Sequence, residues 1–325
     1  MWHAGIDVSK ARLDVYLLLE MDHPAQQAQF DNTLSGYRQL VKWLKRHTEG
    51  DGQVCLEATG VYGQAVTQYL YEQGIAVSVV NPARIKKYAE SRLERHKTDQ
   101  IDAKLIAIFC RKEAPDLWTP PLPELLALQA LVRRRDDLLD LRQQERNRLE
   151  AAQDAAVRLS LEQHLHFIQT QIEQVEQAIH DHLDQHPDLK HQHDLLTSIP
   201  GLGDITACVL LAECRGIRSF DNVRQLVAFA GLNPQQRQSG RMNFTAGISR
   251  MGRKSIRSAL YMPALSAMRY NPLMVDFVAR LRQNGLQGKQ IVVAVMRKLI
   301  HLAYGVLKSG QPFDPHYAAK MAVSA

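Results

Sequence analysis

Four carboxylates in the first third of the chain have types and positions suited to metal binding. Asp7 lies in an apparent strand, G-I-D-V-S-K, and Glu57 ends another, C-L-E-A-T-G. Asp99 and Asp102 begin a predicted helix in K-T-D-Q-I-D-A, where their spacing places both on one face. Mg²⁺ or Mn²⁺ prefers such oxygen ligands, and a pair of these ions can stabilise the attacking and leaving oxygens of a phosphodiester. Taken singly, each acid could be a surface charge or part of an ordinary helix start, with Thr98 as the N-cap.

Ser239 is a candidate nucleophile because of the cations around it. Arg237 and Arg241 flank it, and such side chains can hold a phosphate and stabilise a pentavalent transition state. Further cations follow at Arg250, Arg253, Lys254 and Arg257. Most serines in loops of Gly and Arg are only solvated, and no histidine base lies close to Ser239 in the sequence. We therefore expect the metal-bound carboxylates to approach Ser239 in space and activate its hydroxyl.

The basic charge of the chain is concentrated in one segment. Residues 237–308 hold thirteen Lys or Arg side chains and one acid, Asp276, whereas the whole chain has a formal net charge of +6. A field of one sign in one segment is typical of a polyanion site, so DNA, RNA or both are the expected partners. The alternative is a solvated basic surface without a partner.

A glycine-containing turn precedes this segment and resembles a helix-hairpin-helix element. The string I-P-G-L-G covers residues 199–203 and includes Gly201 and Gly203. Glycines at this place let backbone amides of a helix N-terminus approach a phosphate, which gives contact with nucleic acid independent of sequence. The same glycines could instead form a tight turn between packed helices.

The first 110 residues alternate between strand and helix patterns. We expect strands at 3–8, 13–20, 29–32, 54–57 and 75–80, the first three forming a meander. Helices are expected at 35–46, with Ser35 as N-cap, and at 62–72, followed by a further helix after the last strand. This order predicts an α/β layer with a mixed sheet.

The middle of the chain reads as long helices after a linker at Thr119-Pro120-Pro121-Leu122-Pro123. Apolar residues recur in a strict heptad pattern at Leu161, Leu165, Ile168, Ile172, Val175 and Ile179. This predicts a helical hairpin or a coiled coil, and so narrow a stripe favours self-association. His182 and His186 have a spacing that could bind metal, but no acidic or cysteine ligand completes a tetrahedral set, so a solvated face is the preferred interpretation.

Several protein classes are excluded by composition. The aliphatic runs are shorter than the roughly 18 residues of a transmembrane helix, and the N-terminus lacks a secretory signal. Four cysteines, Cys55, Cys110, Cys208 and Cys214, form no C-x-x-C pair, so we expect buried free thiols. We therefore expect a cytoplasmic protein that makes no membrane contact.

Seven strings occur in the order seen in one protein family. They are G-I-D-V-S-K, L-E-A-T-G-V-Y, V-V-N-P-A-R, K-T-D-Q-I-D-A, S-I-P-G-L-G, F-A-G-L-N-P and Q-S-G-R. The chain thereby resembles, over nearly its whole length, the DEDD insertion-sequence transposases of the IS110 type, now described as bridge-RNA-guided recombinases. The resemblance implies an RNase H-like (RuvC-like) N-terminal domain at 1–115, a linker and coiled-coil helices at 116–194, and a mostly α C-terminal transposase domain at 195–325.

The resemblance also implies residue roles, partners and a bacterial-type protein that acts at the nucleoid. The family's four acidic residues align with Asp7, Glu57, Asp99 and Asp102 as ligands of Mg²⁺, for which Mn²⁺ can substitute, and its serine aligns with Ser239. It implies DNA strand exchange through a phosphoserine link, with a structured guide RNA that selects donor and target DNA. We expect a homo-oligomer, a dimer or a tetramer, whose protomers could each supply half of a site.

Three other classes would use the same features differently. A RuvC-like endonuclease would use the four acids with water as nucleophile and would not need Ser239. An actin-like or sugar-kinase-like ATPase also begins with a G-I-D strand, but it requires a second phosphate-binding hairpin that is absent from the sequence. A non-catalytic nucleic-acid-binding protein would explain the basic segment and leave the acids without a role.

Overall fold

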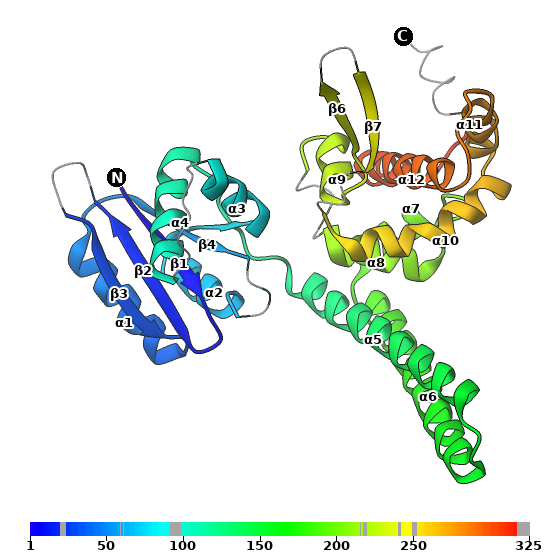
Figure 1. The fold of residues 1–325 in the computed structure, drawn as a ribbon, viewed down its shortest axis with the longest axis horizontal. Helices are drawn as coiled ribbons and strands as arrows, with labels where there is room; N and C mark the ends of the chain where they lie inside the picture. The colour runs from blue at the N-terminus through cyan, green and yellow to red at the C-terminus, as the bar shows by residue number, and fades with distance from the viewer. Residues whose placement is uncertain are drawn as a thin grey trace. The chain divides into compact units, whose positions relative to one another are not determined.

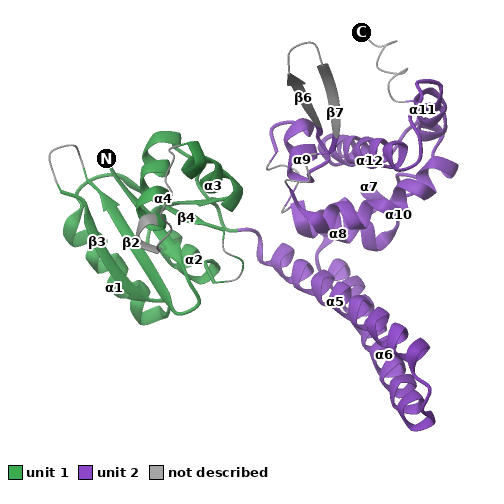
Figure 2. Cartoon of the chain, in the orientation of Figure 1, with its two compact units in different colours: residues 1–120 green, residues 121–325 purple. Residues whose placement is uncertain are grey.

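The chain folds into two compact units, residues 1–120 and 121–325 (Figure 1, Figure 2). The computed structural model describes residues 1–19, 24–58, 60, 62–91, 99–214, 216, 220–239, 242–248 and 252–316, with the backbone alone at 99–101, 235–239 and 242–246. The boundary between the units falls within the predicted proline-rich linker. The finer three-part division stays a prediction.

A mixed sheet forms the centre of the first unit. Its strands are β1 (Trp2–Val8), β2 (Arg12–Leu18), β3 (Gln26–Asp31), β4 (Gly52–Glu57) and β5 (Ala76–Val80). Their order in the sheet is β3-β2-β1-β4-β5. β1, β2 and β3 pair antiparallel as a meander, and β4 pairs parallel with both β1 and β5. The predicted α/β layer with a mixed sheet is confirmed.

Helices cover both faces of this sheet. α1 (Leu34–His47) and α2 (Gln64–Glu72) pack on one face, where Leu40 and Leu70 are buried in the same cluster as Ile6 of β1. α4 (Asp99–Glu113) packs on the opposite face, against β1, β2 and β4, and α3 (Pro82–Ser91) packs beside it. The alternation of side chains along β1 therefore decides which of its residues face α4.

The start of α1 differs from the prediction. Thr33, not Ser35, is the N-cap, and its Oγ1 accepts a hydrogen bond from the Gly36 amide at 3.3 Å. Both hydroxyls have the required chemistry, but the N-cap residue has an extended backbone, and Thr33 has φ −139° and ψ 163°. Ser35 lies inside the helix instead.

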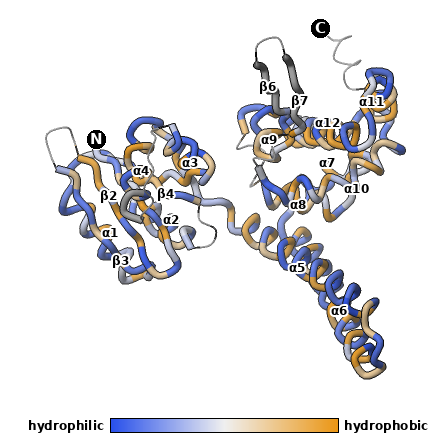
Figure 3. Tube along the Cα trace, in the orientation of Figure 1, coloured by the Kyte–Doolittle hydropathy of each residue, from blue (hydrophilic) through white to orange (hydrophobic). Residues whose placement is uncertain are grey.

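The second unit begins with a hairpin of two long helices, α5 (Pro123–Ala151) and α6 (Ala155–Gln185). They run antiparallel, and hydrophobic and hydrophilic residues alternate along both (Figure 3). Ile168 and Ile172 of the predicted heptad stripe are buried against Leu138 of α5. The stripe thus has a partner within the same chain, so the helical hairpin is confirmed. Self-association stays a prediction.

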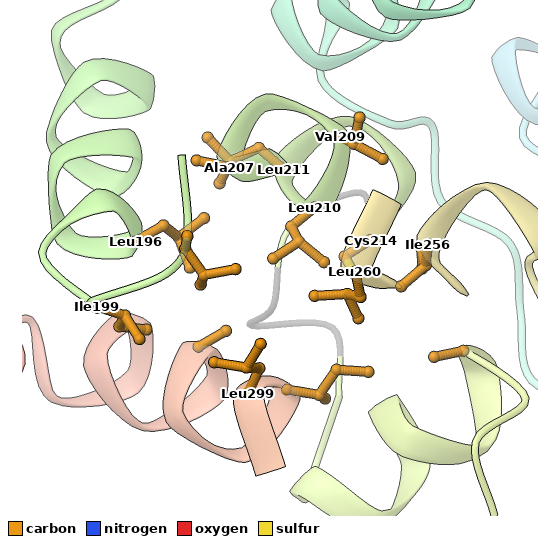
Figure 4. Close-up of a cluster of buried hydrophobic side chains, with 14 of the residues drawn as sticks. Leu196, Ile199, Ala207, Val209, Leu210, Leu211, Cys214, Ile256, Leu260 and Leu299 are labelled. Atoms are coloured by element: carbon orange, nitrogen blue, oxygen red, sulfur yellow. The ribbon is translucent and has the colours of Figure 1, made fainter. Parts of the chain in front are cut away.

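The rest of this unit is a helical domain with a small two-stranded sheet. Its elements are α7 (Pro187–Thr197), α8 (Asp204–Cys214), α9 (Val223–Phe229), β6 (Pro234–Ser239), β7 (Met242–Ile248), α10 (Lys254–Tyr270), α11 (Pro272–Gln283) and α12 (Lys289–Ser309). The apolar helix α8 lies at the centre, where Leu210 points toward Leu260 of α10 and Leu299 of α12 (Figure 4). The mostly helical character expected after residue 195 is confirmed.

One helix in the described part of the chain, α12, is long and apolar enough to cross a membrane by length and composition. Half of its most apolar window is buried in the unit, with Leu299 and Ile300 in the core. Core helices of this kind pass the same test, so α12 is weak support for a membrane span.

Candidate active site

Asp7 and Glu57 lie on the same face of the sheet. β1 and β4 are parallel, with Gly5 opposite Cys55 and Ile6 opposite Leu56. Because side chains alternate along a strand, Asp7 shares the face of Gly5, and Glu57 shares the face of Cys55. This shared face contacts α4. Cys55 is buried with residues of α4, and a Cβ added at Gly5 would lie 2.2 Å from the carbonyl oxygen of Ala103. The two carboxylates therefore project from the face that α4 covers.

The N-terminus of α4 lies at the same end of this face. Ala103 contacts Gly5, whereas Cys110 contacts Gln53, which pairs with His3 earlier in β1. α4 therefore runs opposite to β1, and its first turn lies toward the end of β1 that carries Asp7. Asp102 follows in that turn, directly before Ala103, and Asp99 is the first residue of the helix. The positive end of the helix dipole at this place favours carboxylates nearby.

The chemistry of this donor set fits a hard divalent cation. Asp7, Glu57 and Asp102 are partly buried, and each makes interactions within the protein. Among the described side chains, no three His, Cys, Asp or Glu residues lie close enough together to hold a metal ion. The side chain of Asp99 is not described. The carboxylates would supply only oxygen ligands, which suits Mg²⁺ or Mn²⁺ better than zinc.

Sequence reasoning missed a further carboxylate on this face, Asp14. It lies in β2 directly opposite Asp7, and its exposed fraction is only 8%. Gln29 of β3 donates from Nε2 to Asp14 Oδ1 at 2.9 Å. The signal in the sequence was an acid within the apolar strand R-L-D-V-Y-L-L, where a solvated charge is out of place.

The predicted nucleophile lies on the other unit. Ser239 is the last residue of β6, and its backbone pairs with Met242 at the start of β7. Arg237 is opposite Phe244 on the same hairpin. The side chains of Ser239 and Arg237 are not described, and Arg241, Arg250 and Thr98 lie outside the described residues. The approach of Ser239 to the carboxylates stays a prediction.

Three cations after the hairpin have different surroundings. Arg253 forms an ion pair with Glu213 of α8 at 3.5 Å, and its guanidinium lies 5.5 Å from the centre of the Phe229 ring. Arg257 donates from Nη1 to the carbonyl oxygens of Ala230 and Gly252, at 3.0 and 3.1 Å. Lys254 is exposed. Arg253 and Arg257 thus bind groups within the second unit, and Lys254 is better placed than either to contact a phosphate.

The predicted helix-hairpin-helix turn connects α7 to α8. Gly201 has φ +103°, and a Cβ at this position would lie 2.7 Å from Cβ of Ala267 in α10. This glycine therefore permits close packing of two helices, as the tight-turn alternative requires. Gly203 directly precedes α8, and a Cβ there would meet no atom within 4 Å. Its phosphate-binding role stays a prediction, with an acid, Asp204, in the first turn of the helix.

The other candidate groups have structural roles. His182 contacts the carbonyl oxygen of Glu124 through Nε2 at 2.8 Å, and His186 contacts that of His182 through Nδ1 at 2.7 Å. Burial raises the pKa of Cys208 and of Cys214 to about 12, and a hydrogen bond with Cys110 raises that of Cys55. All four cysteines are free and buried, as predicted. Thiols held in this protonated form are poor nucleophiles.

Comparison with known proteins decides the family. A model described as a transposase of the DEDD, IS110 type matches residues 4–156, and one described as a transposase of the IS116/IS110/IS902 family matches residues 193–279. Two pilin gene-inverting proteins, from Moraxella bovis and Moraxella lacunata, are 34% and 33% identical over 96% of this chain and 97% of their own lengths. The chain belongs to the IS110 family of transposases.

A more distant relative agrees. A transposase for insertion sequence element IS1328 of Yersinia enterocolitica is 25% identical over 77% of this chain and 82% of its own length. As a member of the IS110 family, the chain is a DNA transposase or recombinase, an enzyme that acts on DNA. The DEDD description implies dependence on divalent metal in general. The two matched ranges contain the four predicted carboxylates and Ser239, respectively.

Proposed function

We propose that this IS110-family enzyme cuts and rejoins DNA strands through a covalent phosphoserine link at Ser239. Asp7, Glu57, Asp99 and Asp102 would hold Mg²⁺, or Mn²⁺ in its place, on a unit with the RNase H-like, RuvC-like fold. The observation that carries this proposal is the convergence of Asp7, Glu57 and the first turn of α4 at one end of one sheet face. A donor set of oxygens alone at such a place suits a cation that binds phosphate.

In the proposed reaction, each bond formed to phosphorus replaces one that breaks. When bound, the divalent cation supplies positive charge for the non-bridging and leaving oxygens of a phosphodiester. Ser239 Oγ loses its proton and forms a bond to phosphorus as the bond to one strand's oxygen breaks, which releases a strand hydroxyl. Arg237 and Arg241, beside Ser239 in the sequence, would offset the charge that develops on the phosphate. A hydroxyl of the exchanged strand then attacks the phosphoserine and restores Ser239.

The relatives' name supports rejoining over hydrolysis. Inversion of a pilin gene, which the name of the Moraxella proteins describes, requires that cut ends be joined again. A covalent link to the protein conserves the phosphodiester bond for that step, whereas hydrolysis would lose it. For the same reason we prefer strand exchange by this chain to the activity of a RuvC-like endonuclease.

The proposed partners follow from charge and family. Residues 237–308 would bind donor and target DNA together with a structured guide RNA, and the phosphate contacts would fall on the basic segment that includes Lys254. A homo-oligomer, either a dimer or a tetramer, would bring two sets of units to the paired DNA. The acidic centre and Ser239 of one site could then belong to different protomers.

The test of the acidic centre is a strand-cleavage assay with the full-length chain, the ends of its insertion sequence and the RNA encoded beside it. Asp7→Asn, Glu57→Gln and Asp102→Asn should each lower cleavage by at least about 100-fold, because the charge that binds the cation is lost. Chelation of divalent metal should abolish it. Asp31→Asn, which removes an exposed carboxylate of β3, is the matched control and should retain activity. Wild-type cleavage by any two of the three variants would refute the assignment.

A further inference from the structure

A row of polar side chains crosses four adjacent strands on the face covered by α4. Asp7 of β1 is opposite Asp14 of β2, and Asp14 is opposite Gln29 of β3. On the other side of Asp7, the parallel register of β1 and β4 ends at the pair of Ile6 and Leu56, and Glu57 directly follows Leu56. Neighbouring strands lie about 4.8 Å apart, so each carboxylate of the row is next to another.

Asp14 is the most buried of these carboxylates, and no described cation neutralises it. Its exposed fraction is 8%, and no Lys, Arg or His among the described residues forms an ion pair with it. Gln29 Nε2 occupies Oδ1, while Gln29 Oε1 accepts from Arg12 Nη1 at 3.3 Å, which fixes the orientation of the amide. Among the described residues, the hydrogen-bond partner of the Asp14 carboxylate is a neutral amide. Burial of a carboxylate in such surroundings is costly, and the cost falls if a cation binds nearby.

A polar cavity adjoins Asp14. Its volume is about 190 Å³, and Asp14, Tyr16, Gln27, Gln29 and Ala103 are among the residues that line it. A water molecule in the liquid takes about 30 Å³, so the cavity has room for several. Ala103 also contacts Gly5 beside Asp7, so the cavity lies next to the proposed metal centre. Mg²⁺ gives up its water reluctantly and usually keeps several ligands of this kind.

We propose that Asp14 is a fifth carboxylate of the cation site, which binds the water shell of the ion held by Asp7. Gln29 is its positioning residue: it holds Oδ1 and leaves Oδ2 to accept hydrogen bonds from the ion's water ligands. The proposal rests on the metal centre of the proposed function. It adds a residue of β2, a strand from which no residue of this site was predicted. It also explains why an acid lies in the otherwise apolar strand β2.

The test is Mn²⁺ binding by the full-length chain without nucleic acid, measured from the loss of the free-ion signal in electron paramagnetic resonance. Asp14→Asn should weaken Mn²⁺ affinity by about 10- to 100-fold, the range for residues that support metal ligands from outside the coordination shell. Gln29→Ala should weaken it less, because the carboxylate remains but loses its orientation. Asp31→Asn, an exposed carboxylate on the same strand as Gln29, should bind Mn²⁺ like the wild type.

Thermal melting separates this role from a purely structural one. Without metal, Asp14→Asn should melt no lower than the wild type, because the substitution removes a buried charge and keeps an acceptor for Gln29. Its melting temperature should rise less when Mn²⁺ is added. A lower melting temperature without metal, combined with unchanged Mn²⁺ affinity, would show that Asp14 only supports the sheet and would overturn the proposal.

Asp7→Asn distinguishes an error in the role of Asp14 from an error in the metal centre itself. If Asp7→Asn loses Mn²⁺ binding and Asp14→Asn does not, the metal centre stands and the role of Asp14 is refuted. If neither variant changes Mn²⁺ affinity, both the metal centre and the role of Asp14 are refuted.

Discussion

At the scale of single residues, neighbouring cations in one basic run have different tasks. The sequence predicts the cluster of Arg253, Lys254 and Arg257, but it does not show which charges the protein uses internally. The reason is that the counter-ion of Arg253 is Glu213, forty residues earlier and 3% exposed in its side chain. Glu213 lies within an apolar helix, and its pairing with Arg253 and with Arg133 of α5 depends on tertiary packing.

We therefore expect Arg253→Ala to change the stability of the protein and Lys254→Ala to change its affinity for DNA. Arg253→Ala should lower the free energy of unfolding by about 1–3 kcal/mol, because it leaves a buried carboxylate with less compensation. Lys254→Ala should leave stability unchanged. It should instead reduce the slope of log affinity for duplex DNA against log salt by about 0.9, if Lys254 contacts one phosphate.

Denaturant unfolding and DNA binding at several salt concentrations measure the two effects. An unchanged salt slope in Lys254→Ala would make this lysine a solvated charge. A stable Arg253→Ala with a reduced slope would reverse the two roles.

At the scale of elements, short apolar and β-branched runs were enough to predict the strands of the sheet. The runs that contain Asp7 and Glu57 formed β1 and β4, and the connection pattern placed them side by side. Asp14 was marked in the sequence as an acid within an apolar strand, but its position opposite Asp7 was not predictable without the register of β2. The packing of α4 on the sheet was also unpredictable, because it depends on the absence of a side chain at Gly5, where α4 approaches backbone to backbone.

Gly5→Ala tests whether this close approach positions the acidic centre. Its Cβ would lie 2.2 Å from the Ala103 carbonyl oxygen and 2.3 Å from the Ala107 amide nitrogen, and neither backbone can move without displacing α4. We expect a loss of at least about 1 kcal/mol, the lower range for overpacked cores, together with loss of DNA cleavage.

Gly305→Ala is the matched control for this substitution. Gly305 is an exposed residue of α12 where a Cβ meets no atom within 4 Å, so alanine should be neutral or stabilise the helix by up to about 1 kcal/mol. Circular dichroism melting and the cleavage assay give both readouts. Wild-type stability and cleavage in Gly5→Ala would show that α4 does not need this contact.

At the scale of the whole molecule, the two halves of the proposed site lie on different units. The carboxylates belong to residues 1–120, and Ser239 belongs to residues 121–325. The sequence predicted both halves from local patterns, since charge and motif are properties of short segments. In the proposed function, their meeting would depend on how the units, and the protomers of an oligomer, are arranged on nucleic acid, which no local pattern encodes.

The most direct test of the central claim is covalent capture of labelled DNA on a denaturing gel. Wild-type protein with its RNA, DNA and Mg²⁺ should yield an adduct that survives denaturation, because Ser239 would be joined to the cut strand. Ser239→Ala should bind RNA and DNA nearly as the wild type does, since one hydroxyl adds little to an interface dominated by phosphate contacts. It should form neither adduct nor recombinant product. Metal-dependent cleavage that persists in Ser239→Ala would contradict the claim and assign the nucleophile to water, as in a RuvC-like endonuclease.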